Sequence, residues 1–172
     1  MITLFENFHN KPIVNSVSPE FWEMVEIADW RKVINGYQKN PIINDERRSF
    51  FKQAQNRIYS RYSYEDIIKF KKEYNIIYYQ LCDYFEKFMN DEKYSSDIPS
   101  DDGYSDLISS VIGKGKKWVE TCVNHTQFFI QMAIDEDYEE NFSYLLNISK
   151  QDYNEVTEEF NPILKDTRKY NV

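Results

Sequence analysis

The segment Ser63–Met89, SYEDIIKFKKEYNIIYYQLCDYFEKFM, carries the clearest structural pattern in this chain of 172 residues. Ser63 is a suitable N-cap, and Asp66 three residues later completes a pattern close to a capping box. No Gly or Pro interrupts the segment. Its apolar and aromatic residues recur at steps of three and four, which places them on one stripe of a helix: Ile67, Phe70, Tyr74, Ile77, Leu81, Tyr84 and Phe88. The pattern predicts one long central helix over about residues 64–90, against which the other elements pack.

Helical patterns also precede this segment. Ser18 as a cap and Pro19 at the first helical position predict a helix over residues 18–28. The apolar pattern over residues 30–37 either extends that helix or forms a second short one. A further helix is predicted over residues 44–62, with Arg47, Arg48, Lys52, Arg57 and Arg61 largely outward and Phe50, Phe51, Ala54, Ile58 and Tyr59 inward.

After the long helix, residues 91–104 have the composition of a polar loop, and Ser105 or Asp106 is expected to open the next helix. Short apolar segments then follow the break expected at Gly113 and Gly115. A last helix, ended by the Asn161-Pro162 pair, is expected to turn Tyr153, Val156 and Phe160 inward and Asp152, Glu155 and Glu159 outward. We therefore predict an all-α fold: an irregular single-domain helical bundle over residues 18–162, with a leader over 1–17 and a tail over 163–172.

The charge of the chain is unevenly distributed. Its formal net charge is −8, with 13 Lys and Arg against 12 Asp and Glu in residues 1–90, and 8 against 17 in residues 91–172. An acidic field opposes nucleic acid or an anionic membrane as partner and favours a basic protein, although acidity that only aids solubility remains an alternative. The fourteen Tyr residues suit a core margin where rings are buried and hydroxyls stay polar, or else a partner surface.

Two cysteines, Cys82 and Cys122, lie on separate helical patterns without a CxxC pair. We expect them to be small buried hydrophobes in a reducing compartment, although a disulfide between them stays open. The start MITLFENFHN lacks the long apolar core of a signal peptide, and no segment is apolar enough for a membrane span. The expected location is the cytoplasm.

Four patches in the order of the chain resemble an uncharacterised bacterial family, the domain of unknown function numbered 4240. They are Phe21-Trp22-Glu23, the helix start Tyr64–Ile68, the motif Ser100–Tyr104, which includes Asp101, Asp102, Gly103 and Tyr104, and the segment Tyr153–Thr157. The chain departs from the family pattern at 85–97, where a Trp-rich segment is usual, and at 113–115. The resemblance implies an all-α domain and no particular reaction.

The residues offer few candidates for chemistry. Asp101, Asp102 and Asp106 beside Asp97 could hold a hard cation, but their spacing is not that of an EF-hand, and a helix cap before the next helix is the favoured interpretation. The only imidazoles, His9 and His125, lack a third ligand at zinc-site spacing. Cys122 and His125 could form a thiolate-imidazole pair, but a chance spacing of these two residues is the favoured interpretation. Lys114, Lys116 and Lys117 lack the strand and spacing of a phosphate loop.

These observations favour a binding protein that occludes a basic partner surface, most concretely an immunity protein that neutralises a bacterial toxin. An enzymatic role is less favoured, and we expect no catalytic residue, cofactor or metal. The alternatives are a phage anti-defence protein that imitates DNA charge, and a small enzyme or metal-binding domain built on Asp101 and Asp102. The oligomeric state stays open. The partner contacts are expected at Asp135, Glu136, Asp137, Tyr138, Glu139, Glu140, Asp152, Tyr153, Glu155 and Glu159.

Overall fold

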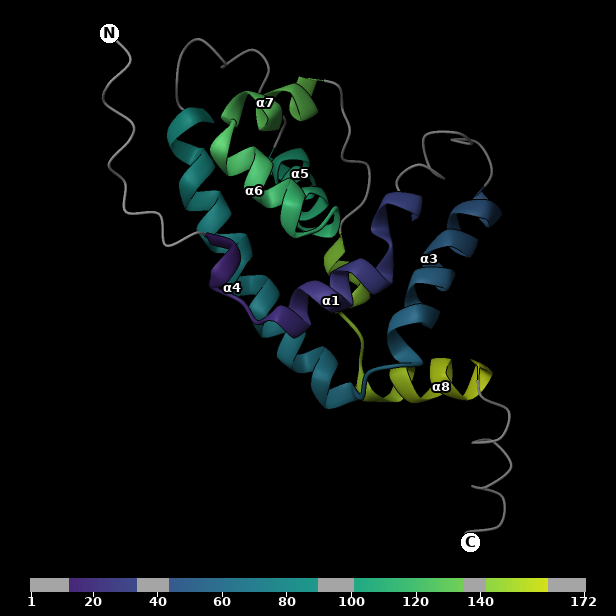
Figure 1. Ribbon diagram of the computed structural model, residues 1–172. Coiled ribbons are helices and arrows are strands. Elements are labelled where there is room, and N and C mark those ends of the chain that lie inside the picture. Colours follow the sequence, from purple (N-terminus) through teal and green to yellow (C-terminus); the bar gives the residue numbers. More distant parts are fainter. Residues whose placement is uncertain (1–12, 34–43, 90–100, 135–141, 161–172) are drawn as a thin grey trace, which may run out of the picture.

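Every element of the computed structural model is helical over the residues that it describes, 13–33, 44–89, 101–134 and 142–160 (Figure 1). The all-α prediction is therefore confirmed. The elements are the 3₁₀ turn η1 (Ile13–Asn15), α1 (Pro19–Ala28), α3 (Asn44–Tyr59), α4 (Tyr64–Met89), α5 (Asp101–Gly113), α6 (Lys116–Asn124), α7 (Thr126–Ile134), the 3₁₀ turn η3 (Phe142–Leu145) and α8 (Lys150–Phe160).

Helix α4 is the long helix expected from the sequence. Its N-terminus has a complete capping box, because the Asp66 backbone N–H donates to Ser63 Oγ (3.2 Å) and the Ser63 N–H donates to Asp66 Oδ2 (3.0 Å). The expected stripe is buried at Ile67, Phe70, Tyr74, Ile77 and Leu81, joined by Phe85, while Tyr84 is only half-buried. Phe88 lies in the helix, but its side chain is outside the described set.

The central position of α4 is not confirmed. In Figure 1 this helix runs diagonally along one side, with α5, α6 and α7 beside its C-terminal part and α8 meeting its first turn. Its outer face exposes Ile76 (47%) and Tyr79 (65%). The core is instead distributed over the helices from α1 to α7 and η3, and the largest of its fully buried side chains are aromatic: Trp30, Phe21, Phe85, Phe129 and Phe142.

Tyrosine hydroxyls connect the helices at the margin of this core. Tyr74 donates to Ser109 Oγ (2.9 Å) and Tyr78 to Ser105 Oγ (3.1 Å), which joins α4 to α5. Tyr84 donates to the Val123 carbonyl of α6 (2.7 Å), and Tyr59 donates to the Leu145 carbonyl of η3 (2.6 Å). These rings are buried or half-buried, so each hydroxyl keeps a partner while the ring packs, as the core-margin interpretation requires.

Helix α1 ends as a separate element. Ser18 caps its start by accepting the Phe21 N–H (3.2 Å), as predicted. Asp29 adopts the left-handed conformation (φ 50°, ψ 50°), and its N–H donates to the Glu26 carbonyl (3.1 Å). This reversal breaks the helix, and Trp30 begins a new helical turn, which resolves the open alternative in favour of two elements.

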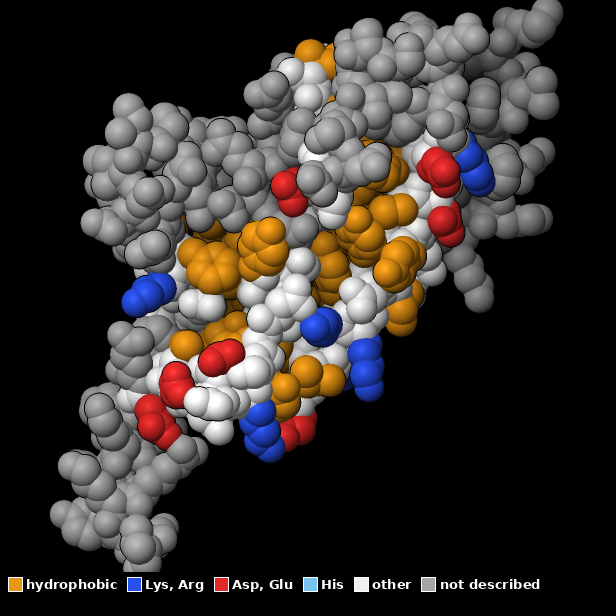
Figure 2. All heavy atoms as spheres, turned by 180° about the vertical axis from the view of Figure 1, so that it is seen from behind, with side chains coloured by type: hydrophobic (Ala, Val, Ile, Leu, Met, Phe, Trp, Pro, Cys, Tyr) orange, Lys and Arg blue, Asp and Glu red, His pale blue; other side chains and the backbone are white. Residues whose placement is uncertain are grey.

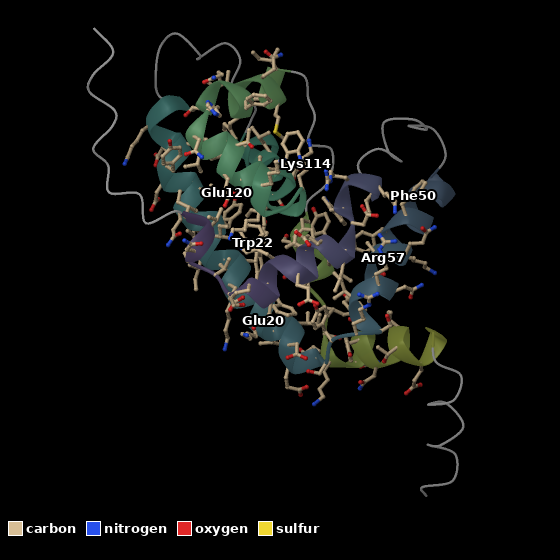
Figure 3. The ribbon with its side chains drawn as sticks, viewed as in Figure 1. Glu20, Trp22, Phe50, Arg57, Lys114 and Glu120 are labelled. Atoms are coloured by element: carbon tan, nitrogen blue, oxygen red, sulfur yellow. The ribbon has the colours of Figure 1, made fainter. Side chains whose placement is uncertain are left out.

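Arg57 on α3 was expected outward, and this expectation is wrong. Its guanidinium donates from Nε to the Ile27 carbonyl (3.1 Å) and from Nη2 to the Ala28 carbonyl (2.6 Å), at the C-terminus of α1. Figure 3 shows Arg57 between these two helices. A cation at this end satisfies carbonyls that lack helical partners and complements the helix dipole.

The expected loop over residues 91–104 is too long at its C-terminal end, because α5 begins at Asp101 rather than at Ser105 or Asp106. Asp101 and Asp102 therefore lie inside the first turn, where they were expected to precede it as caps. The expected break after α5 is confirmed at Gly113–Gly115.

Candidate functional site

The expected partner surface is only partly within the described residues. Asp135, Glu136, Asp137, Tyr138, Glu139 and Glu140 lie outside them, and Glu159 lies in α8 with its side chain outside them. Asp152 and Glu155 are exposed on α8, as predicted. Asp152 also takes part in the N-terminal cap of α8, because Ser149 Oγ donates to Asp152 Oδ2 (2.7 Å) and accepts the Asp152 N–H (3.0 Å).

Tyr153 was expected both to face inward on its helix and to contact a partner, and the structure places its ring against other tyrosines. Its hydroxyl donates to the Tyr62 carbonyl (2.6 Å), and its ring lies 5.4 Å from that of Tyr59 and 5.7 Å from that of Tyr64. The side chain is half-buried and joins α8 to the turn between α3 and α4. The inward orientation expected from helical spacing is the one observed.

Carboxylates from α1 and α4 lie near this tyrosine cluster. Burial is the first cause that raises the pKa of Tyr62, and the charges of Glu23 on α1 and Asp66 on α4 raise it further. Burial likewise raises the pKa of Tyr153, with further contributions from Glu65 and Asp66. Glu23 and Asp66 therefore both lie near Tyr62, although they are distant in sequence.

We call this surface the acidic face and define it by Glu20, Glu23, Glu65, Asp66, Asp152 and Glu155. Lys150 connects its α8 and α4 parts, because its Nζ lies 3.8 Å from Glu65 Oε1 and 5.9 Å from the centre of the Tyr64 ring. The pKa of Glu20 is lowered by hydrogen bonds at its own backbone and from Ser18. The pKa of Asp66 is lowered by hydrogen bonds from Ser63. The carboxylates of Glu20 and Asp66 therefore remain charged well below neutral pH.

Sequence reasoning missed the α1 and α4 members of the acidic face, because the N-terminal half is nearly neutral in sum. Glu20, Glu23 and Glu26 recur every three residues on the exposed side of α1, which is the signal that could have found them. Figure 3 shows Glu20 near the start of α1, close to α4. The acidic surface thus combines residues from both halves of the chain.

The cysteine and metal candidates receive no support within the described residues. Both cysteines are free, and burial raises the pKa of Cys122 to about 12, so its thiol is protonated at neutral pH. His125 is exposed whereas Cys122 is buried. The side chains of Asp101 and Asp102 and the whole of Asp97 are outside the described set, and within that set no three His, Cys, Asp or Glu side chains are placed to hold a metal ion.

Exposed apolar side chains form the other notable surface feature. Viewed from behind, hydrophobic side chains reach the surface between separate charged groups (Figure 2). The large ones are spread over α4, α7 and η3: Ile76, Tyr79, Phe128, Ile134 and Tyr144. None of the helices, over their described residues, is long and apolar enough to cross a membrane.

These features define the class as an all-α domain with an acidic face built around tyrosines. The chain belongs to the family described as "Protein of unknown function (DUF4240)", whose model matches residues 18–155. No curated protein and no solved structure matches the chain significantly.

The family-motif residues serve the core where their side chains are described. Phe21 is fully buried, the Trp22 indole N–H donates to the Val14 carbonyl (2.9 Å), and the Tyr104 hydroxyl donates to the Cys82 carbonyl (3.2 Å). Gly103 lies in the first turn of α5 beside Asp101 and Asp102. These contacts assign the described motif residues to folding.

Proposed function

We propose that this protein is a binding protein that occludes a basic surface on a partner protein by means of the acidic face. The observation that carries the proposal is the placement of carboxylates from α1 and α4 near Tyr62 and Tyr153, together with the exposed Asp152 and Glu155 on α8, the helix that carries Tyr153. A predominantly acidic surface steers a basic partner toward it and favours correct orientation during docking.

Two helix caps support a preorganised surface. Asp66 and Asp152 are each held by hydrogen bonds with a serine three residues earlier, so their positions are fixed before a partner arrives. A surface that is ordered in the free protein loses less conformational entropy on binding. The half-buried Tyr153 supports the acidic face from beneath and need not contact the partner.

The most concrete form of the proposal is an immunity protein that acts in the cytoplasm and neutralises a bacterial toxin by covering a basic cleft. In this form residues 135–140 and Glu159 remain the further contact positions expected from sequence. A phage anti-defence protein that imitates DNA charge would use the same surface. Duplex DNA would compete with this protein for a DNA-binding partner. It would not displace a toxin that does not bind DNA.

The test begins with partner capture from source-cell lysate and continues with association kinetics on the purified partner. The double variant Glu23→Lys/Glu65→Lys reverses two exposed carboxylates on different helices of the acidic face. Asp83→Lys/Glu86→Lys makes the same change in net charge on exposed positions near the end of α4, away from this face.

We expect Glu23→Lys/Glu65→Lys to slow association by about tenfold at low salt and to reduce the salt dependence of the association rate. Asp83→Lys/Glu86→Lys should change the association rate much less. Equal effects of the two variants would assign the attraction to net charge alone and would overturn the acidic face as the docking surface. Circular dichroism spectra that match the original protein would confirm that both variants are folded.

A further inference from the structure

A cavity of about 390 Å³ lies between the end of α1 and the turn that joins α5 to α6. Asp29, Trp30 and Arg31 form one side, and the turn Gly113–Gly115 with the first residues of α6 forms the other. Figure 3 shows Lys114 at this turn, on the side toward the end of α1. The volume is within the range of pockets that hold small molecules.

The cavity is basic although the protein is acidic. Among the described residues that line it, four are cations, Arg31, Lys114, Lys116 and Lys117, and two are carboxylates, Glu26 and Asp29. Asp29 is already paired with Lys32. The cavity therefore favours an anionic occupant, in contrast to the acidic face.

The N-terminus of α6 adds backbone donors to this cavity. Gly115 is its N-cap and has no side chain to accept hydrogen bonds from the first turn. The N–H groups of Lys116 and Lys117 have no hydrogen-bond partner among the described residues, whereas the Trp118 N–H donates to the Gly115 carbonyl (3.0 Å). Free N–H groups and the positive end of the helix dipole together favour an anion, above all a phosphate group.

Trp30 provides an independent observation in the wall of the same cavity. Its side chain is only 1% exposed, yet its indole Nε1 has no hydrogen-bond partner in the described part of the chain. The pyrrole edge of the ring faces the turn, since a Cβ added to Gly113 would lie 2.5 Å from Trp30 Cδ1, the atom bonded to Nε1. A buried donor without a partner is costly in a folded protein, so an acceptor brought by a ligand would stabilise it.

Lys114 and Trp118 complete the cavity wall. Lys114 is only 7% exposed, and its ammonium group lies 4.9 Å from the centre of the Trp118 ring. The cation–π contact holds a charge at the cavity where solvent screens it little. The half-exposed Trp118 ring offers an apolar surface beside that charge.

We propose that this cavity, the Lys114 pocket, binds a small molecule that carries a phosphate monoester, such as a sugar phosphate or a mononucleotide. The phosphate group accepts hydrogen bonds from the Lys116 and Lys117 N–H groups and pairs with Lys114, and the organic part lies along Trp118. Gly115 is required at the turn because its φ of 102° is strained for any other residue. This arrangement does not require the strand and residue spacing of a phosphate loop, which the sequence lacks around Lys114.

The test is a titration of ¹⁵N-labelled protein with inorganic phosphate, ribose 5-phosphate and AMP, with ribose and adenosine as phosphate-free controls. The three tryptophans give separate indole N–H signals in an NMR spectrum. We expect saturable shifts for the Trp30 and Trp118 indoles and for the Lys116 and Lys117 amides. The Trp22 indole, bonded to the Val14 carbonyl, is the internal reference that should not move.

The variant Lys114→Met retains an apolar stem and should weaken binding by about tenfold, the amount set by losing one charge-assisted contact. Because Lys114 is buried, Lys116→Gln/Lys117→Gln provides a second test at less buried positions, and Lys72→Gln on the exposed surface of α4 is the matched control.

Absence of saturable shifts with every phosphate compound up to roughly 10 mM, a concentration that would detect even millimolar affinity, would overturn the proposal. Equal shifts with ribose or adenosine would also overturn it, as would unchanged affinity in both lysine variants. The Lys114 pocket shares no residue with the acidic face, so either proposal can fail without the other.

Discussion

Arg57 shows how one side chain can end a helix in another part of the chain. Its guanidinium satisfies carbonyls at the C-terminus of α1 from its position on α3. Such carbonyls otherwise depend on water or on the next residues of the chain. The packing of α1 against α3 therefore includes a polar interaction of fixed geometry.

Replacing Arg57 should destabilise the protein more than replacing an exposed cation on the same helix. Arg57→Met removes hydrogen bonds from a charged donor, which is expected to cost about 1.5–3 kcal/mol. Urea denaturation measures the change in free energy of unfolding. Lys52→Met, at an exposed position of α3, is the control and should change it by no more than about 0.5 kcal/mol. Similar losses in both variants would show that the contact adds no stability.

Gly113 is a second residue whose effect is local and steric. A methyl group at this position would approach Trp30 Cδ1 to 2.5 Å and Phe142 Cβ to 3.1 Å. Gly113→Ala should therefore destabilise the fold by about 1–3 kcal/mol through overpacking. In the double variant with Trp30→Phe the loss should be smaller than the sum of the two single losses, as measured by thermal or urea denaturation. Strict additivity would contradict the steric cause.

At the level of the element, the helix that begins at Tyr64 depends on its cap. Ser63→Ala removes the acceptor of the Asp66 N–H and should cost about 1 kcal/mol. The free energy of unfolding by urea at neutral pH measures this loss. Gln80→Ala, at an exposed position in the interior of α4, is the control because it touches no cap. If both variants unfold alike, the capping box contributes nothing.

The same cap predicts a pH dependence. Hydrogen bonds from Ser63 lower the pKa of Asp66 below its ordinary value of 3.8. A carboxyl whose pKa is lower in the folded state stabilises that state above the unfolded pKa, and this contribution is lost as pH falls through the folded pKa. The stability difference between the original protein and Asp66→Asn should therefore be present at neutral pH and shrink below pH 3.8. Denaturation over an acidic pH series would measure it, and a constant difference would contradict the assignment.

Capping residues and apolar periodicity predicted the helices from sequence. The candidate surfaces depend mostly on tertiary contacts, which these local patterns do not contain. The Ser63–Asp66 cap and the stripe from Ile67 to Leu81 depend only on neighbours in sequence, so periodicity and capping rules found them. The start of α5 was misplaced because Asp and Gly are typical of both loops and helix starts. The outward assignment of Arg57 failed because its partners lie on another helix, about thirty residues earlier in the chain.

The acidic face and the Lys114 pocket could not be predicted for the same reason. Glu23 and Asp66 are distant in sequence and come near the same side chain, Tyr62, only in the folded chain. Trp30 reaches Gly113 only because the left-handed Asp29 redirects the chain after α1. A net charge summed over half of the sequence does not reveal an acidic or basic cluster that forms only when distant residues come together.

For the whole molecule, the continuous core predicts cooperative unfolding. Buried residues from α1 to η3 form one cluster, against which the α8 residues Tyr153 and Val156 pack. Helix content by circular dichroism and tryptophan fluorescence should therefore change at the same urea concentration, as in a two-state transition. A clear separation of the two curves would show that the α5–α7 part and the α1–α3–α8 part unfold independently.

The close approach of Trp30 to Gly113 also has an evolutionary consequence. The space for the indole exists only because position 113 carries no side chain. A relative in the family that acquired Ala or Ser at the position of Gly113 would need a smaller residue in place of Trp30 to keep the turn against the end of α1. The two positions should therefore change together among the family's sequences, and their joint variation would record this contact across species.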